Sequence, residues 1–209
     1  HLAIKLNFFD SVVIANGLYG CATWNIDKSL MAKLDSWKFR HLKKILRYKW
    51  SDYCSYLDII ERINSYGIKI ETMETIIRKR RLMYLGHVLR MPDYRLPKIM
   101  LHAEVEAGRR LQGRPELSYR ACIKDDLDHF GIQVTASNQF HLLESMVNNM
   151  AFWKYKVLNG AAEFLDNWKL GEMYASYERH KEVFMLTWEG VDAPSEALLE
   201  DSWKTKRGV

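Results

Sequence analysis

Apolar residues recur every three or four positions along most of the chain, which is the spacing of an amphipathic α-helix. The first segment with this spacing covers residues 3–19, and Gly20 is suited to end it. The pattern therefore predicts an all-α protein. The expected buried stripe of the first helix consists of Ile4, Phe8, Val12, Ala15 and Tyr19, with Phe9 and Val13 beside it.

Capping residues mark the starts of two further helices. Asp27 has the short acceptor side chain of an N-cap and precedes a periodic segment over residues 27–49. Ser55 followed by Asp58 has the spacing of a capping box and predicts a helix over residues 55–64. Further helices are expected over residues 71–90, 115–131, 138–158 and 161–188, whereas residues 98–105 fit either a short strand or a half-buried helix.

The order of these elements predicts how the chain is organised. We expect a helical bundle with a basic irregular hinge, followed by a C-terminal helical extension. The expected divisions are a basic helical domain with its hinge loop over residues 1–131, the extension over residues 132–188, and a loose tail over residues 189–209.

Composition favours a folded protein in a reducing compartment. Of the 209 residues 48% are hydrophobic, which is enough for a core and unlike the composition of disordered chains. Cys21, Cys54 and Cys122 are too far apart for a disulfide framework or a paired zinc site. No apolar run approaches the roughly 18 residues of a membrane-spanning helix, and the chain does not begin like a secretory signal. We expect an intracellular protein, nuclear or cytoplasmic, without a membrane partner.

The net charge of +5 is unevenly distributed. Residues 1–37 are neutral, residues 38–120 carry 19 basic and 9 acidic side chains, and residues 121–209 carry 9 basic and 14 acidic ones. A basic middle beside an acidic end is typical of a chain in which one part meets a polyanion. The alternative is an ordinary solvated surface.

Three acid-free basic clusters lie in the middle part. They read WKFRHLKKILRYKW over residues 37–50, IIRKRRLMYLGHVLRM over residues 76–91 and GRRLQGRP over residues 108–115. Several phosphates must be neutralised before counterion release gives useful affinity, so three clusters in one chain indicate phosphate binding. Trp37 and Trp50 fit either stacking on unpaired bases or packing in the core.

We find no motif that would supply catalysis, a metal site or a cofactor site. Asp125 and Asp126 are adjacent, but Ile123 replaces the aromatic residue of the hairpin turn that presents two metal-binding aspartates in polymerases. We expect this pair on a solvated helix face. The sequence has no phosphate loop and no nucleophile elbow, and its histidines are scattered.

Three segments together resemble one protein family. They are LYGCATW (Leu18–Trp24), RKRRLMYLGHVLRMPDYRLPK (Arg78–Lys98) and GRRLQGRPELSYRACIKDDL (Gly108–Leu127), with a weaker match at FWKYKVLNG (Phe152–Gly160). In this order they resemble the region that follows the polymerase palm in reverse transcriptases of non-long-terminal-repeat retrotransposons. The resemblance covers residues 3–160.

The resemblance implies a thumb domain, a helical unit that grips the template-primer duplex through its phosphates. The catalytic palm is not among these residues, so the chain alone is expected to have no polymerase or nuclease activity. The implied partners are an RNA duplex, a DNA duplex or an RNA–DNA hybrid, together with the palm domain of the same polyprotein. The expected phosphate contacts are Lys38, Arg40, Lys43, Lys44 and Arg47 on one helix, Arg78, Lys79, Arg80, Arg81 and Arg90 on a second, and Arg109, Arg110 and Arg114 in the loop.

Two other hypotheses remain at this point. The chain fits an element-derived helical module whose aromatic, acidic second half docks a protein partner and whose basic face is incidental. It also fits a decayed element remnant without a present role. Backbone-directed binding carries little sequence information, so neither RNA nor DNA is favoured.

Overall fold

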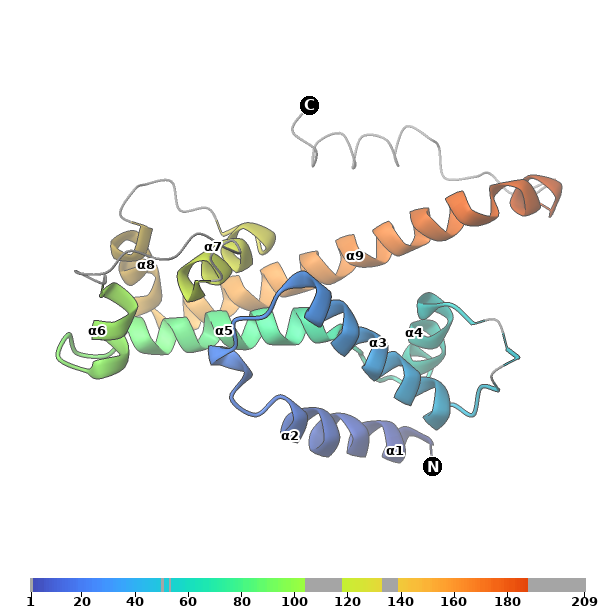
Figure 1. The fold of residues 1–209 in the computed structure, drawn as a ribbon, viewed down its shortest axis with the longest axis horizontal. Helices are drawn as coiled ribbons and strands as arrows, with labels where there is room; N and C mark the ends of the chain where they lie inside the picture. The colour runs from blue at the N-terminus through green and yellow to red at the C-terminus, as the bar shows by residue number, and fades with distance from the viewer. Residues whose placement is uncertain (1, 50, 53, 104–117, 133–138, 188–209) are drawn as a thin grey trace, which may run out of the picture. The chain divides into compact units, whose positions relative to one another are not determined.

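The computed structural model describes residues 2–49, 51–52, 54–103, 118–132 and 139–187 (Figure 1). Within these ranges the chain forms helices and loops without a strand, which confirms the all-α fold class for the described part. The elements are α1 (Leu2–Phe8), a π-helical segment η1 (Phe9–Ile14), α2 (Ala15–Gly17), a 3-10 turn η2 (Cys21–Thr23), α3 (Lys28–Ile45), α4 (Tyr56–Asn64), α5 (Met73–Leu89), α6 (Leu96–His102), α7 (Tyr119–His129), α8 (Gln139–Asn148) and α9 (Met150–Thr187).

The predicted caps are confirmed. The Asp27 side chain accepts a hydrogen bond from the backbone N–H of Leu30 at 2.8 Å and starts α3. Ser55 and Asp58 form the full capping box of α4, with bonds of 3.2 and 2.7 Å. Residues 96–102 form α6, so residues 98–102 of the ambiguous segment are helical.

The N-terminal segment buries a different stripe from the expected one. The π-helical turn η1 inserts a spacing of five between Phe9 and Ile14, and the buried residues are Leu6, Phe9, Ile14 and Leu18. The expected stripe of Ile4, Phe8 and Val12 is exposed, by 65%, 60% and 38%. The expectation was wrong because it assumed 3.6 residues per turn throughout.

Helix α5 lies at the centre of the bundle, among α3, α6, α7 and α8 (Figure 1). It contacts α3, η2, α6, α7 and α8. Because neighbours surround it, α5 buries residues on every side, including Thr75, Arg78 and Arg81 as well as its aliphatic side chains. A helix in this position has little solvent face on which to leave a basic cluster.

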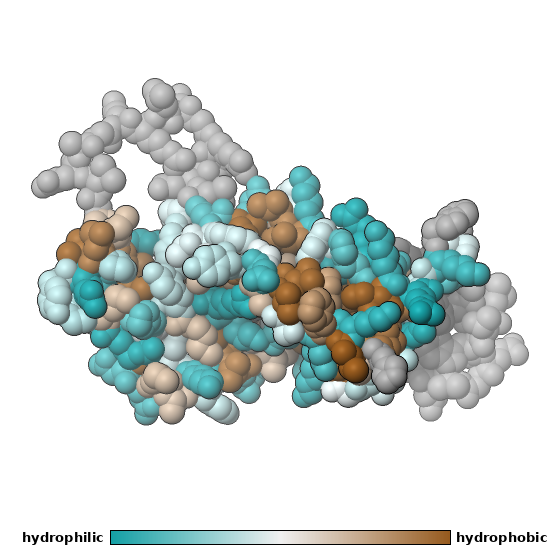
Figure 2. All heavy atoms as spheres, turned by 90° about the horizontal axis from the view of Figure 1, so that it is seen from below, coloured by the Kyte–Doolittle hydropathy of each residue, from teal (hydrophilic) through white to brown (hydrophobic). Residues whose placement is uncertain are grey.

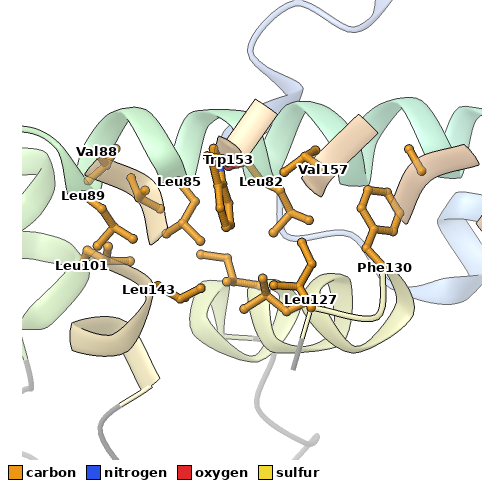
Figure 3. Packing of buried hydrophobic residues seen from close by; sticks show 14 residues of the cluster. Leu82, Leu85, Val88, Leu89, Leu101, Leu127, Phe130, Leu143, Trp153 and Val157 are labelled. Atoms are coloured by element: carbon orange, nitrogen blue, oxygen red, sulfur yellow. Dashed lines mark hydrogen bonds between the residues drawn. The ribbon is translucent and has the colours of Figure 1, made fainter. Parts of the chain in front are cut away.

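Trp153 of α9 fills the centre of a core cluster formed by α5, α6, α7, α8 and α9 (Figure 3). Its indole is 1% exposed, and its Nε1–H donates a hydrogen bond to the Leu82 carbonyl oxygen at 3.1 Å. Gly86 of α5 makes room for it, since a Cβ at that position would lie 2.3 Å from Nε1. The glycine that sequence alone marks as a defect in a helix is therefore a packing requirement.

Packing divides the chain between Asp166 and Asn167, within α9. The expected division after residue 131 is not a packing boundary, because Leu143 of α8 and Val157 of α9 share one core cluster with Leu127 of α7. The helix break expected near Gly160 is also absent, since α9 continues through it. Gly160 instead permits a close approach, as a Cβ there would lie 2.5 Å from the Phe130 carbonyl oxygen. The expected tail over residues 189–209 lies outside the described residues.

Candidate nucleic-acid interface

The arginine run of α5 forms a buried ion-pair network with α7. Arg81 donates from Nε to Asp126 Oδ2 at 2.6 Å and from Nη2 to Asp126 Oδ1 at 3.1 Å. Arg78 donates from Nη1 to Asp126 Oδ1 and to Asp125 Oδ2, each at 2.7 Å, and also pairs with Glu74. Arg81 further donates to the Trp24 carbonyl oxygen at 3.0 Å. The network thus joins α5, α7 and the loop after η2.

Burial decides the electrostatics of this network. Asp126 is 0% exposed, and burial raises its pKa to about 6 although both arginines lower it. Asp125 has the opposite shift, because its hydrogen bond from Arg78 holds its pKa below the ordinary value. The expectation of a solvated carboxylate pair is corrected for Asp126, whose side chain neutralises two buried guanidinium groups.

The expectation that Arg78 and Arg81 contact phosphate is corrected as well. Their side chains are 4% and 2% exposed, and their donors are used on carboxylates and, for one nitrogen of Arg81, on the Trp24 carbonyl oxygen. Lys79 is half-buried and paired with Glu71. Arg80 donates to the Leu18 carbonyl oxygen at 3.2 Å, and Arg90 donates to that of Val147 at 3.1 Å. Most of this predicted strip therefore holds helices together.

Two further hydrogen bonds, made by Lys38 and Asp35, join α3 to the start of α5. We call this pair of contacts the clasp. Lys38 is 1% exposed and its Nζ donates to the Glu71 carbonyl oxygen at 2.8 Å, so the expectation that Lys38 contacts phosphate is corrected. Burial lowers the pKa of Lys38. One turn earlier, Asp35 Oδ1 accepts a hydrogen bond of 2.6 Å from the Met73 backbone N–H, the first residue of α5. The clasp fixes the orientation of α3 on the bundle.

The half-buried Asp35 predicts a pH dependence of stability. Desolvation raises its pKa from 3.8 to about 6, so the folded protein binds this proton more tightly than the unfolded chain. Ionisation of Asp35 therefore lowers stability as the pH rises from 3.8 to about 6. Asp35→Asn lacks this titration, and its deficit in unfolding free energy relative to wild type should shrink by about 2 kcal/mol between about pH 4 and pH 7.

Urea unfolding of both proteins across this pH range measures the effect. The free energy of unfolding is plotted against pH for each protein. Subtracting the curve of the variant from that of wild type removes the titration of the other acidic groups. A deficit that is constant with pH, or that grows as the pH rises, would contradict the raised pKa.

Helix α3 carries an exposed basic face on the side away from this clasp. Lys33, Arg40 and Lys44 are spaced by seven and four residues, so they share one side of the helix, and all three are exposed. Asp35, the acidic residue within α3, lies on the other side, where it meets Met73. We define the α3 basic face as Lys33, Arg40, Lys44 and Arg47.

Arg47 holds a conformation that glycine usually occupies. Its φ is +60°, and it follows the end of α3 with two backbone bonds typical of a Schellman motif. Its N–H donates to the Lys44 carbonyl oxygen at 3.1 Å, and the N–H of Tyr48 donates to that of Lys43 at 3.0 Å. A left-handed arginine costs about 1–2 kcal/mol relative to glycine, and such strain clusters at functional positions.

The structure thus separates the predicted contacts. Arg40, Lys44 and Arg47 are exposed together, Lys43 is half-buried beside them, and their contact with phosphate stays a prediction. Lys33 belongs to the same face but lies outside the three basic clusters, so the signal for it in the sequence is its seven-residue spacing to Arg40. Trp37 packs between Phe9 and His41, with ring centroids 6.1 and 4.6 Å away. Trp50, Arg109, Arg110 and Arg114 lie outside the described residues.

Other site chemistry is limited in the described ranges. There, no three His, Cys, Asp or Glu side chains are grouped so as to hold a metal ion. In the same residues, no helix combines the length and the apolar character that crossing a bilayer requires. Comparison of the chain with models of protein families, with curated proteins and with solved structures gives no match.

Proposed function

We propose that the chain binds the phosphate backbone of a nucleic-acid duplex, without catalysis, through the α3 basic face. The observation that carries this proposal is the exposure of Lys33, Arg40 and Lys44 on one side of a helix whose acidic residue is turned to the core. In the α5 run, by contrast, most cations are held by carboxylates and carbonyl groups.

The dimensions of the face suit a polyanion. Lys33 and Lys44 are eleven residues apart, which corresponds to about 16 Å along the helix axis. Duplex DNA carries one phosphate charge per roughly 1.7 Å of its axis, so such a face spans several phosphates. The Asp35 and Lys38 clasp supports the proposal further, since it holds α3 in place before any ligand binds.

We assign this grip to a thumb-like role in a retrotransposon reverse transcriptase, on the basis of the motifs at residues 18–24, 78–98 and 108–127. In that role the chain would hold a template-primer duplex while a palm domain carries out the chemistry. The structure adds a reason for the three motifs to occur together. Arg81 of the second donates hydrogen bonds to the Trp24 carbonyl oxygen of the first and to Asp126 of the third, so one arginine joins the described parts of the three segments.

Charge neutralisation tests the proposal directly. The triple variant Lys33→Gln, Arg40→Gln, Lys44→Gln should weaken duplex binding at low salt by about a hundredfold or more. It should also reduce the slope of log K against log salt concentration by about 3, because three phosphate contacts are lost. Fluorescence anisotropy with a labelled duplex at several salt concentrations measures both quantities.

A matched control distinguishes binding through the α3 basic face from binding that depends on net charge alone. The triple variant Lys69→Gln, Arg95→Gln, Lys124→Gln removes the same residue types from exposed positions outside α3. It should retain most of the affinity and of the salt slope. Equal weakening by the two triple variants would mean that binding depends on total charge alone and would overturn the assignment to α3. Circular dichroism and urea unfolding establish that both variants are folded.

A second candidate function is docking of a protein on the N-terminal helices. Ile4, Phe8 and Val12 are exposed there, and Figure 2 shows hydrophobic side chains gathered on this face of the molecule. Contiguous exposed apolar side chains favour contact with another protein surface. The charge-neutralised variant separates the two functions, because it leaves this apolar face unchanged.

A further inference from the structure

A hollow of about 430 Å³ opens at the surface where α2, η2, α5 and α9 meet. Its apolar wall includes Ala15, Leu18, Met83 and Leu158, and Tyr19 and Arg80 also line it. The volume is within the range of small-ligand sites, which is about 300–1,000 Å³. None of the described residues that line it carries a carboxylate.

Arg80 supplies a positioned cation at this hollow. Its Nη1 donates to the Leu18 carbonyl oxygen at 3.2 Å and approaches Cys21 Sγ at 3.9 Å. Within the described part of the chain, Nε and Nη2 of Arg80 have no hydrogen-bond partner, so they can be offered to an anion. Lys79 also lines the hollow, but its ammonium group is paired with Glu71.

Tyr19 supplies an aromatic surface at the same place. Its side chain is 88% exposed, which is unusual for so large an apolar group. The turn that carries it is fixed, because Gly20 adopts φ +70° and the N–H of Cys21 donates to the Leu18 carbonyl oxygen at 3.2 Å. The exposed ring therefore stands on an ordered turn.

We propose that this hollow binds a single unpaired nucleotide of the nucleic acid held by the α3 basic face. The base stacks against Tyr19 and the apolar wall, and its phosphate accepts hydrogen bonds from Arg80. This inference rests on the proposed function and specifies its ligand as a duplex with an unpaired end. A nucleotide fits better than an acidic peptide, because an apolar wall, an exposed aromatic ring and the two remaining donor nitrogens of Arg80 match a base and one phosphate.

The test uses the full chain and two labelled duplexes of about two helical turns. One carries a short single-stranded 3′ overhang, and the other carries the same overhang with its bases removed. Wild type should bind the first about tenfold more tightly, since stacking of one base is worth about 1–3 kcal/mol and about 1.4 kcal/mol corresponds to a factor of ten. Tyr19→Ala and, separately, Ala15→Phe, which fills the hollow from an exposed position, should abolish the difference.

The controls make each outcome decisive. Tyr94→Ala removes a tyrosine that is 79% exposed and does not line the hollow, and this variant should keep the tenfold difference. Arg80→Gln should weaken binding of both overhangs, since both retain the phosphate. If wild type binds the two duplexes equally well, the nucleotide site is refuted while the duplex grip stands. If wild type binds neither duplex, both the proposed duplex binding and the nucleotide site are refuted. If the hollow binds an acidic aromatic peptide instead, only the nucleotide site is refuted.

Discussion

Asp126→Asn is expected to lower the free energy of unfolding by about 3–5 kcal/mol. The substitution keeps the shape of the side chain but removes the charge that Arg78 and Arg81 face at 0% exposure. It also places an amide N–H₂ opposite guanidinium donors. A buried pair gains little over an apolar replacement, but removing one partner leaves buried charge without compensation. Urea unfolding followed by tryptophan fluorescence measures the loss.

The neighbouring carboxylate provides the control. Asp125 is 46% exposed and pairs with Arg78, which keeps Glu74 and Asp126 as partners, and with His129, whose Nδ1 lies 3.5 Å from Asp125 Oδ1. Asp125→Asn should therefore lower the unfolding free energy by no more than about 1 kcal/mol. Equal effects of the two substitutions would show that the network does not discriminate between a buried and an exposed carboxylate, contrary to the contacts described above.

Gly86→Ala is expected to destabilise the protein by about 2–3 kcal/mol, although alanine favours a helix by about 1 kcal/mol over glycine. The added methyl group would lie 2.3 Å from Nε1 and 2.5 Å from Cδ1 of Trp153. Trp153 cannot move aside freely, because it is buried within the core and donates a hydrogen bond to Leu82 (Figure 3). The clash therefore outweighs the gain in helix propensity. Thermal or urea unfolding measures whether the substitution lowers or raises the free energy of unfolding.

Gly17→Ala is the matched control for this substitution. Gly17 is also helical, but a Cβ there meets nothing within 4 Å. Its replacement should leave stability unchanged or raise it by up to about 1 kcal/mol. Stabilisation by Gly86→Ala would sink the packing argument, and so would destabilisation of the same size by Gly17→Ala.

Local chemistry was enough to predict several elements from the sequence. Asp27 and Ser55 start helices because a short acceptor side chain satisfies N–H groups within three residues, whatever the rest of the fold does. The all-α class follows in the same way from repeated spacings of three and four. The same reasoning missed Lys33 only because density of charge was weighed above spacing along α3.

Which basic side chains are buried and which are exposed could not be predicted in this way. Sequence places Lys38, Arg78 and Arg81 in basic clusters together with Arg40 and Lys44, and nothing local separates them. The same holds for the apolar stripe of α1, which the π-helical turn rotates from Ile4 and Phe8 to Leu6 and Phe9. Lys38, Arg78 and Arg81 each donate a hydrogen bond to a residue that is distant in the chain.

By itself, the sequence determined the fold class, the caps and the presence of a large excess of positive charge in residues 38–120. Tertiary structure alone decided which cations meet solvent and which meet carboxylates. The reason is that α5 is enclosed by neighbouring helices, so its arginines lose water and require Asp126, whereas α3 is covered on one side only. Desolvation depends on what packs against a residue, and no local pattern encodes that.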